Sequence, residues 1–347
     1  MGLEDRAKDR TRRRKGRRTR GVHTLPAMDL DVVFLGTGGS IPSARRNTAG
    51  VLVRRGGDRI LFDCGEGIQR QMQRSVGLIP VDEIFITHLH ADHYLGLPGL
   101  LKSYEMQDRI EPLVIHGPPG LISLFESIAR IVGRQGYPVE LVELNRAETV
   151  ERDGYAIEPF DVAHRVIANG YVLFEHPRAG RFDPAAASAL GVQPGPAFGA
   201  LQRGQEVPGK DGPVRPEQVM GPDRPGRKIV ITGDTAPCEA TRIAAHEAEL
   251  LVHDSTFTSD EAGRAAETGH STAREAAALA AESRVQMLAL VHISSRHFVP
   301  DVLEEAREAF AGAVAPRDFD VVEIPLPERG APELIPNGAR EGSPSPG

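Results

Sequence analysis

Four side chains of the kind that bind metals lie within the stretch ITHLHADH. They are His88, His90, Asp92 and His93, and they follow an apolar run that predicts a buried strand. Polar groups at the end of a buried strand are costly unless a partner satisfies them. Imidazole and carboxylate ligands without a thiolate suit zinc, with manganese or iron as alternatives. The stretch therefore predicts a metal site.

The spacing of these four residues assigns them to two metal ions. His88 and His90 stand two positions apart, so on extended backbone their side chains point the same way and reach one metal. Asp92 and His93 follow where the chain turns, and we expect them to face a second metal beside the first.

Other predicted strands also end in metal-type side chains. His164 in FDVAHRV supplies a further ligand for the first metal, and His292 in LVHISSR supplies one for the second. Asp234 in ITGDT is a carboxylate able to bridge both metals, and His253 and Asp254 follow a strand in the same way. A single histidine at a strand end is usually structural. Several such ends at one rim favour a two-metal centre.

The elements that must position these side chains alternate between strands and helices, which predicts an α/β domain over residues 28–335. Apolar strands are expected within 30–39, 50–67, 83–90, 228–235, 248–257 and 286–296. Helical spacing marks 97–107, 121–133 and, after a Ser/Thr cap, 271–283. His116 is expected to be solvated in a turn.

One internal segment and both ends depart from this pattern. Residues 176–226 are rich in Pro and Gly with little apolar periodicity, which predicts a long irregular insertion that is functional or mobile. Residues 1–27 are basic, with ten Lys or Arg against three Asp or Glu in the first twenty. They are interpreted as a disordered tail before Met28 or as an RNA-binding arm. Residues 336–347 are expected to be disordered.

Composition limits the class of protein. The 347 residues carry a net charge of −7 and include two cysteines, too few for a disulfide framework, which favours a reducing cytoplasm. We find no apolar run of membrane-spanning length and no secretory signal, so no membrane partner is expected.

The motifs HLHADH and GDT resemble the metallo-β-lactamase fold, an αββα sandwich with a two-zinc site at one rim. The match narrows to the ribonuclease Z family through FLGTGGSIPSARRNTAG, LFDCGEGIQRQM, GHST and HISSR. The insertion also resembles the flexible Gly-Pro arm with which that family clamps tRNA. The resemblance implies a homodimeric tRNA 3′-endonuclease. It cuts the 3′ trailer from tRNA precursors, leaving a 3′-hydroxyl on the tRNA and a 5′-phosphate on the trailer.

The resemblance also assigns roles to individual residues. Two zinc ions per subunit are implied, one held by His88, His90 and His164, the other by Asp92, His93 and His292, with Asp234 bridging. It makes Asp92 the residue that orients the attacking water and His270, backed by Asp254, the general acid. The family has Glu where Asp254 stands, so their pairing is a hypothesis. Substrate contacts are predicted at Arg45, Arg46, Asn47, Gly195, Pro196 and Arg296.

Two other classes of function compete with this one. A small-molecule phosphodiesterase or arylsulfatase of the same fold would keep the metals and need no Gly-Pro arm. A non-catalytic RNA-binding or scaffold protein is expected to lose at least one ligand, whereas all seven positions are filled here. Within the arm, Phe198 either stacks on a nucleotide or pins the arm to itself.

Overall fold

The computed structural model describes residues 29–146 and 148–338. The predicted tail 1–27 lies outside these described residues. Residues 339–347 of the predicted tail 336–347 also lie outside them. The described chain forms two compact units. One is Pro177–Arg224, and the other joins Asp29–His176 to the chain from Pro225 onward.

The larger unit contains a mixed sheet of eight strands. β1, β2 and β3 pair antiparallel, whereas β3, β4, β5 and β6 run parallel. The strand order is β17 (Glu333–Ile335), β16 (Val321–Glu323), β1 (Leu30–Gly36), β2 (Gly50–Arg55), β3 (Asp58–Phe62), β4 (Glu83–Phe85), β5 (Leu113–Gly117) and β6 (Val139–Glu143).

A second sheet in the same unit has seven strands. β12, β13, β14 and β15 are parallel neighbours, so their carboxyl ends meet at one edge. The strand order is β15 (Ala313–Val314), β14 (Met287–Val291), β13 (Leu250–Asp254), β12 (Lys228–Ile231), β9 (Asn169–Glu175), β8 (Tyr155–Asp161) and β7 (Val150–Arg152).

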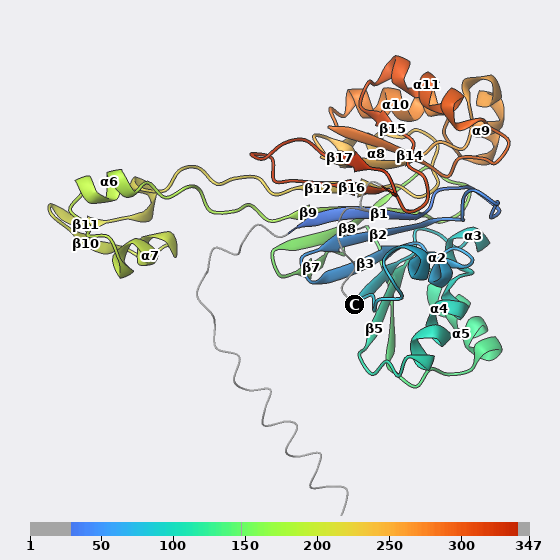
Figure 1. The fold of residues 1–347 in the computed structure, drawn as a ribbon, viewed down its shortest axis with the longest axis horizontal. Helices are drawn as coiled ribbons and strands as arrows, with labels where there is room; N and C mark the ends of the chain where they lie inside the picture. The colour runs from blue at the N-terminus through green and yellow to red at the C-terminus, as the bar shows by residue number, and fades with distance from the viewer. Residues whose placement is uncertain (1–28, 147, 339–347) are drawn as a thin grey trace, which may run out of the picture. The chain divides into compact units, whose positions relative to one another are not determined.

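Helices cover the outer face of each sheet (Figure 1). The first sheet carries α2 (Ile68–Ser75), α3 (Ala91–Tyr94), α4 (Leu97–Met106) and α5 (Leu121–Val132). The second carries α8 (Glu239–Ala245), the short η2 (Ser259–Glu261), α9 (Ala262–Thr268), α10 (Ala273–Glu282) and α11 (Val299–Ala309). This arrangement confirms the predicted αββα sandwich.

The alternation of side chains along β1 shows why the sequence folds this way. Val32 and Phe34 belong to the apolar cluster between the two sheets. Val33 and Leu35 belong to the cluster between the first sheet and its helices. Because successive strand residues face opposite sides, a strand buried on both faces must be apolar throughout. Burial of both faces therefore explains the apolar run from Val32 to Leu35, whereas the half-buried Asp31 near the start of the strand pairs with Arg54.

His116 corrects one expectation. It lies in β5 and is buried, with its Nε2 atom 2.7 Å from Oε2 of Glu83 and its ring stacked on Phe85. Oε1 of Glu83 also accepts a hydrogen bond of 2.5 Å from Arg152. The prediction of a solvated turn was wrong because the parallel pairing of β4 with β5 places His116 beside Phe85, inside the sheet.

The smaller unit corrects a second expectation. It contains α6 (Pro184–Ala189), α7 (Pro196–Gln202), the hairpin of β10 (Val207–Gly209) and β11 (Gly212–Val214), and η1 (Pro216–Gln218). It has its own apolar core of Ala187, Val192, Leu201, Val207, Val214 and Val219. The prediction of an irregular insertion was wrong because these core residues are spread over elements too short to show a period.

Candidate active site

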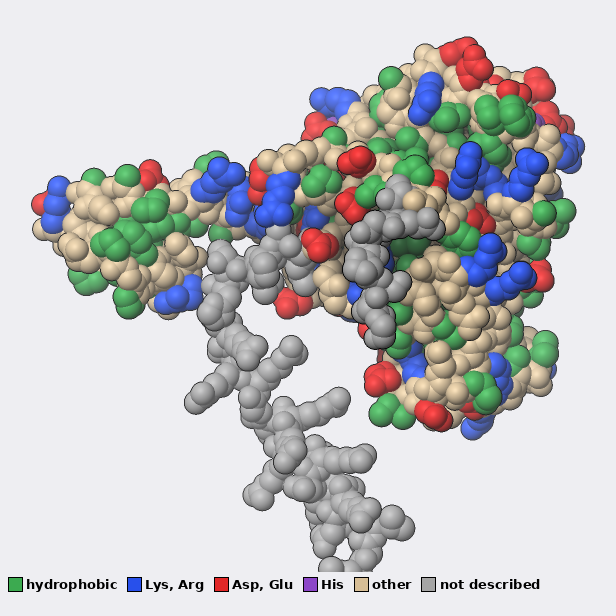
Figure 2. All heavy atoms as spheres, in the orientation of Figure 1, with side chains coloured by type: hydrophobic (Ala, Val, Ile, Leu, Met, Phe, Trp, Pro, Cys, Tyr) green, Lys and Arg blue, Asp and Glu red, His purple; other side chains and the backbone are tan. Residues whose placement is uncertain are grey.

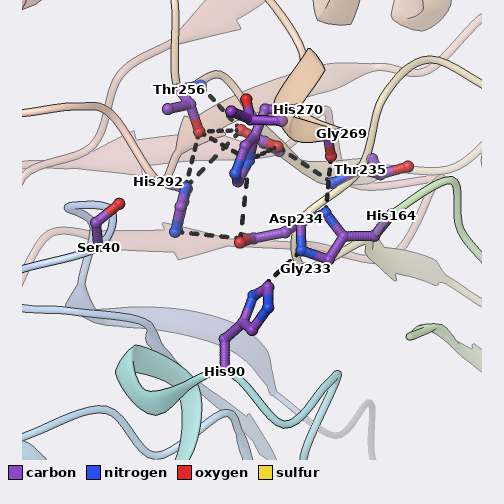
Figure 3. A network of polar contacts seen from close by, with 12 residues as sticks. Ser40, His90, His164, Gly233, Asp234, Thr235, Thr256, Gly269, His270 and His292 are labelled. Atoms are coloured by element: carbon purple, nitrogen blue, oxygen red, sulfur yellow. Dashed lines mark hydrogen bonds and ion pairs between the residues drawn. The ribbon is translucent and has the colours of Figure 1, made fainter. Parts of the chain in front are cut away.

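The predicted metal ligands come from both sheets and meet at one rim (Figure 3). His88 and His90 follow β4, and Asp92 and His93 lie in the short helix α3 that comes next. The other three follow the carboxyl ends of β8, β12 and β14, and they are His164, Asp234 and His292. The fold thus brings together all seven residues that the sequence analysis assigned to the metal site.

The first ligand group contains three histidines. Nε2 of His88 lies 3.0 Å from Nδ1 of His90, and Nε2 of His164 lies 3.2 Å from the same Nδ1 atom. Oδ2 of Asp234 is 3.6 Å from Nε2 of His88. Ligand atoms of these four residues all lie within 4.8 Å of one another, a spacing that fits a single cation.

The second ligand group lies beside the first. Oδ2 of Asp92 is 3.2 Å from Nε2 of His292 and 3.7 Å from Nε2 of His93. The backbone N–H of Ser40 donates a hydrogen bond of 2.9 Å to the same Oδ2 atom. That bond fixes the orientation of the Asp92 carboxylate.

Asp234 lies between the two groups. Its Oδ2 atom faces His88, whereas its Oδ1 atom is 3.3 Å from Nε2 of both His93 and His292. Oδ1 of Asp234 and Nε2 of His93 are buried, and neither has a hydrogen-bond partner among the described residues. Buried polar atoms are rarely left unpaired, so these two fit a site that is completed by cations.

In three of the predicted ligand histidines, the ring nitrogen Nδ1 also contacts a neighbouring polar group. Nδ1 of His93 lies 2.7 Å from Oδ2 of Asp63, Nδ1 of His292 lies 2.8 Å from Oγ1 of Thr256, and Nδ1 of His164 lies 2.8 Å from the Gly269 carbonyl oxygen. Such contacts orient a metal-binding imidazole and set its tautomer. Sequence reasoning missed Asp63, which lies in the motif LFDCGEGIQRQM, and Thr256, which follows Asp254 by two residues.

Burial and charge act differently on the two histidine groups. Burial holds the pKa of His88 well below its usual value, which keeps that ring neutral and ready to ligate. Burial opposes charge on His292 as well, but the Asp234 charge and the hydrogen bond to Asp92 prevail and raise its pKa to about 9. Without a cation, the second group therefore retains a proton that metal binding must displace.

His270 and Asp254 form a pair beside the ligands. Nδ1 of His270 is 2.8 Å from Oδ2 of Asp254, so the shorter carboxylate does reach the imidazole. Asp254 is fully buried and also accepts hydrogen bonds from Thr235 and Thr256. Burial lowers the pKa of His270, but the hydrogen bond that His270 donates to Asp254 outweighs it and the net shift of the pKa is upward.

Five of the seven predicted ligands line a cavity of about 480 Å³, and they are His90, Asp92, His164, Asp234 and His292. His270, Ser40 and Arg165 also line it, and Arg165 is exposed. Sequence reasoning did not select Arg165, although it directly follows His164. The arrangement can hold an anionic group against two cations, with an imidazole at the edge able to transfer a proton.

The arginines predicted to contact the substrate differ in how accessible they are. Arg45 is exposed, whereas the guanidinium of Arg46 donates hydrogen bonds to Oγ1 of Thr37 at 2.5 Å and to the Pro316 carbonyl oxygen at 2.8 Å. Arg296 pairs with Glu261 at 3.2 Å. Arg45 is therefore the more available of the two neighbouring arginines.

Three further predicted positions lie elsewhere. Asn47 donates a 2.9 Å hydrogen bond from its side chain to the Glu66 carbonyl oxygen, which ties the loop before β2 to the segment before α2. Gly195 and Pro196 begin α7 in the smaller unit. Phe198 packs against Phe182 with ring centroids 4.9 Å apart, which favours the interpretation that it pins the arm to itself.

Comparisons with known proteins agree with this geometry. The family model described as the Metallo-beta-lactamase superfamily matches residues 45–291. The chain is 46% identical over 307 residues to Ribonuclease Z of Halorubrum lacusprofundi, covering 87% of this chain and 99% of that protein. It is 48% identical over 302 residues to Ribonuclease Z of Myxococcus xanthus, covering 86% and 98%.

Solved structures show the same similarity. The short form of human tRNase Z superposes with a TM-score of 0.61 at 27% identity, covering 86% of this chain and 99% of that one. The metallo-beta-lactamase fold protein YhfI from Bacillus subtilis gives a TM-score of 0.64 at 18% identity, with 85% and 100% covered. The second similarity concerns the fold alone.

Proposed function

This chain belongs to the ribonuclease Z family of the metallo-beta-lactamase superfamily, and we propose on that basis that it is a metal-dependent endoribonuclease that removes the 3′ trailer from tRNA precursors. The products are a tRNA ending in a 3′-hydroxyl and a trailer beginning with a 5′-phosphate. The geometric observation that carries the proposal is the position of Asp234, whose two oxygen atoms face different ligand groups.

We propose two zinc ions per subunit, with Mn²⁺ or Fe²⁺ as possible substitutes. His88, His90 and His164 would hold one ion, Asp92, His93 and His292 the other, and Asp234 both. When bound, such a pair polarises the scissile phosphodiester and lowers the pKa of the attacking water. The donor set of imidazoles and carboxylates, with its orphaned buried atoms, fits these ions.

The side chains of this protein position the reacting groups. Oδ2 of Asp92 lies at the cavity and is held by the Ser40 N–H, so it can accept a proton from the attacking water and keep that water in line. Asp63 contacts the imidazole of His93, and Thr256 contacts that of His292. These contacts fix the orientation of the two rings toward the metal site.

His270 is the proposed general acid. The departing ribose 3′-oxygen needs a proton, and His270 lines the cavity on the side of Asp254. With Nδ1 bonded to Asp254, the protonated ring carries its transferable proton on Nε2. Asp254 therefore acts as a positioning residue, as well as stabilising the charged imidazolium.

The folded arm Pro177–Arg224 supplies the proposed grip on the tRNA body. Arg181 and Arg203 offer positive charge within it, and Gly195 and Pro196 form the Gly-Pro turn that opens α7. We further propose a homodimer in the cytoplasm, in which the arm of one subunit grips the tRNA that the other cleaves. Among the described residues, no helix is long and apolar enough to span a bilayer.

Parallel assays on two substrates test this proposal. The metal-loaded protein is given a 3′-extended tRNA precursor and, separately, bis(p-nitrophenyl) phosphate, a small phosphodiester that reaches only the metal site. We expect kcat/KM for the precursor to exceed that for the small diester by orders of magnitude. Efficient hydrolysis of the diester with no cleavage of the precursor would instead assign the site to a small-molecule phosphodiesterase.

A further inference from the structure

A second cavity of about 500 Å³ lies in the larger unit. It is lined by the loop Pro42–Asn47, by residues of α2 and just before it, and by the segment Arg317–Phe319. Its lining includes five arginines and only two acidic residues. The arginines are Arg45, Arg46, Arg70, Arg74 and Arg317, and the acidic residues are Glu66 and Asp318. On the face that Figure 2 shows, Lys and Arg side chains lie among Asp and Glu side chains. The full chain carries a net charge of −7, whereas positive charge exceeds negative charge in the lining of this cavity.

Within the part of the chain that the structure describes, none of the five arginines forms an ion pair with an acidic residue. The guanidinium of Arg46 donates hydrogen bonds to Thr37 and Pro316, which leaves Arg45, Arg70, Arg74 and Arg317. Many other arginines of the larger unit do pair, as Arg54 does with Asp31 at 2.6 Å. All four are exposed, so their charges are available to an anion that enters the cavity.

Asp318, one of the two acidic residues that line the cavity, is already engaged by other hydrogen-bond donors. Asp318 accepts hydrogen bonds from the backbone N–H and Oγ1 of Thr37, from the backbone N–H of Asn47 at 2.7 Å and from the side chain of Gln71 at 2.8 Å. It therefore fixes the walls of the cavity. Its oxygens are occupied by those donors, so the four exposed guanidinium groups keep their positive charge for a ligand.

One wall of the cavity is held in an uncommon backbone conformation. Phe319 has φ of +76°, which a bulky side chain rarely adopts, and its N–H donates a 2.6 Å hydrogen bond to the Phe34 carbonyl oxygen. The guanidinium of Arg74 lies 4.9 Å from the centre of the Phe319 ring. This contact restrains Arg74 before any ligand binds, which lowers the entropy that binding costs.

The loop Pro42–Asn47 connects this cavity to the metal site. Ser40, just before the loop, lines the catalytic cavity and bonds to Asp92, whereas Pro42 onward lines the arginine cavity. The backbone N–H groups of Arg45 and Arg46 donate to Oγ of Ser43, which closes the loop into a tight turn. The catalytic cavity and the arginine cavity are therefore lined by neighbouring residues of one loop, so a single extended polynucleotide strand can contact both.

We propose that the arginine cavity binds backbone phosphates of the RNA strand next to the bond that is cleaved. Guanidinium groups match phosphate geometry in charge and in hydrogen-bond donors, and such contacts set the register of the strand without reading its bases. The proposal adds Arg70, Arg74 and Arg317 to the substrate contacts that were predicted in the loop Pro42–Asn47. The inference rests on the proposed function, because it deepens how the same site holds its RNA substrate.

The test compares two double variants in cleavage of a 3′-extended tRNA precursor. Arg70→Ala/Arg317→Ala removes two charges from the cavity and leaves the Arg74–Phe319 contact intact. Arg130→Ala/Arg134→Ala removes two exposed charges that line neither cavity. We expect the cavity variant to raise KM about tenfold or more while kcat stays within about twofold. The dependence of log KM on log salt should weaken by about 0.7 for each single-strand phosphate that the variant no longer neutralises.

The control variant and thermal melting separate the outcomes. If the two double variants change KM equally, or if the salt dependence of the cavity variant matches that of the wild type, the proposal is overturned. Equal melting temperatures show that a raised KM does not come from misfolding. A wild-type protein that hydrolyses bis(p-nitrophenyl) phosphate but leaves the precursor intact refutes the proposed function itself, and that result does not involve either arginine pair.

Discussion

Nδ1 of His270 lies 2.8 Å from Oδ2 of Asp254, in a chain whose family resemblance leads one to expect Glu at the second position. The shorter carboxylate reaches the imidazole because Asp254 ends β13 inside the sheet edge, where Thr235 and Thr256 also donate to it. Through these contacts Asp254 orients His270, although ligand atoms of Asp254, His270, Asp234 and His292 also lie within 4.8 Å of one another.

Replacing His270 with alanine is therefore expected to slow the chemical step and leave the metals in place. Loss of a general acid costs about 10²–10⁴-fold in rate. Single-turnover cleavage of a tRNA precursor and elemental analysis of the purified variant measure the two effects. His246→Ala, at an exposed position after α8, serves as the matched control. If His270→Ala loses one metal per chain, His270 is a ligand and its role as a general acid is void.

Asp92→Ala is expected to reduce cleavage by about 10³-fold or more while the fold survives, because several kcal/mol of transition-state stabilisation depend on the metal-activated water. In the proposed mechanism Asp92 accepts a proton from that water, and its Oδ2 atom lies 3.2 Å from Nε2 of His292 in the second ligand group. Cleavage rate, metal content and circular dichroism are measured together, with Glu126→Ala on the exposed face of α5 as the control. Activity within a few-fold of wild type with full metal content would remove Asp92 from the mechanism.

Deleting the arm is expected to separate tRNA binding from phosphodiester chemistry. The deletion must remove Pro177–Arg224 as a whole. A shorter deletion that ended inside the β10–β11 hairpin would disrupt that hairpin and the apolar core of the arm. A short Gly/Ser linker can close the gap, since Arg178 and Arg224 form a β-bridge at the base of the unit. The precursor should bind much more weakly, and bis(p-nitrophenyl) phosphate should still be hydrolysed at near the original rate.

Leu201→Asp provides a point-mutant version of the same experiment. Leu201 is fully buried in the core of the arm, and a buried unpaired charge should unfold that unit alone. Joint loss of both activities in the deletion and in Leu201→Asp would make the arm part of the active-site scaffold. If neither activity falls, the arm does not hold tRNA.

Glu83→Gln is expected to lower stability in a pH-dependent way. Burial raises the pKa of Glu83, but the hydrogen bonds from His116 and Arg152 prevail and the net shift is downward. A lowered pKa stabilises the folded state above the unfolded value of about 4.3, and the contribution is lost as pH falls through the folded value. The difference in urea midpoint from wild type should therefore be largest at pH 6–7.

The same titration gives the control. The difference in midpoint should shrink below about pH 4.3, the unfolded pKa of a glutamate. Glu126→Gln, which is exposed, should match wild type throughout. A difference that is constant from pH 7 to pH 3.5 would show that the Glu83 charge contributes nothing and that only its shape matters.

The clustering of the predicted metal ligands could be anticipated from sequence, because most of these residues lie in short motifs at the ends of strands. His88, His90, Asp92 and His93 share one such motif, and their residue types already limit the possible partners. Asp63 was not found because an isolated aspartate after a strand is common. Only the pairing of its carboxylate with Nδ1 of His93 distinguishes it.

Features that depend on several short segments were not predictable. The core of the arm gathers single residues such as Ala187, Leu201 and Val214 from separate elements, and none of these elements is long enough to display a hydrophobic period. His116 was misjudged because its burial follows from the pairing of β4 with β5, which local sequence does not encode. The arginine cavity likewise joins segments that are far apart in the chain.

We propose that this chain cuts tRNA precursors at the 3′ end, at a site where Asp234 would contact both metal ions. The most direct test of this proposal is to incubate the zinc-loaded full chain with a precursor labelled at both ends, with and without a chelator, and to map both fragments. The account predicts one cut after the tRNA body, a 3′-hydroxyl on the tRNA, a 5′-phosphate on the trailer, and no cut when the chelator is present. Cleavage that resists the chelator, or fragments with a 2′,3′-cyclic phosphate, would contradict it.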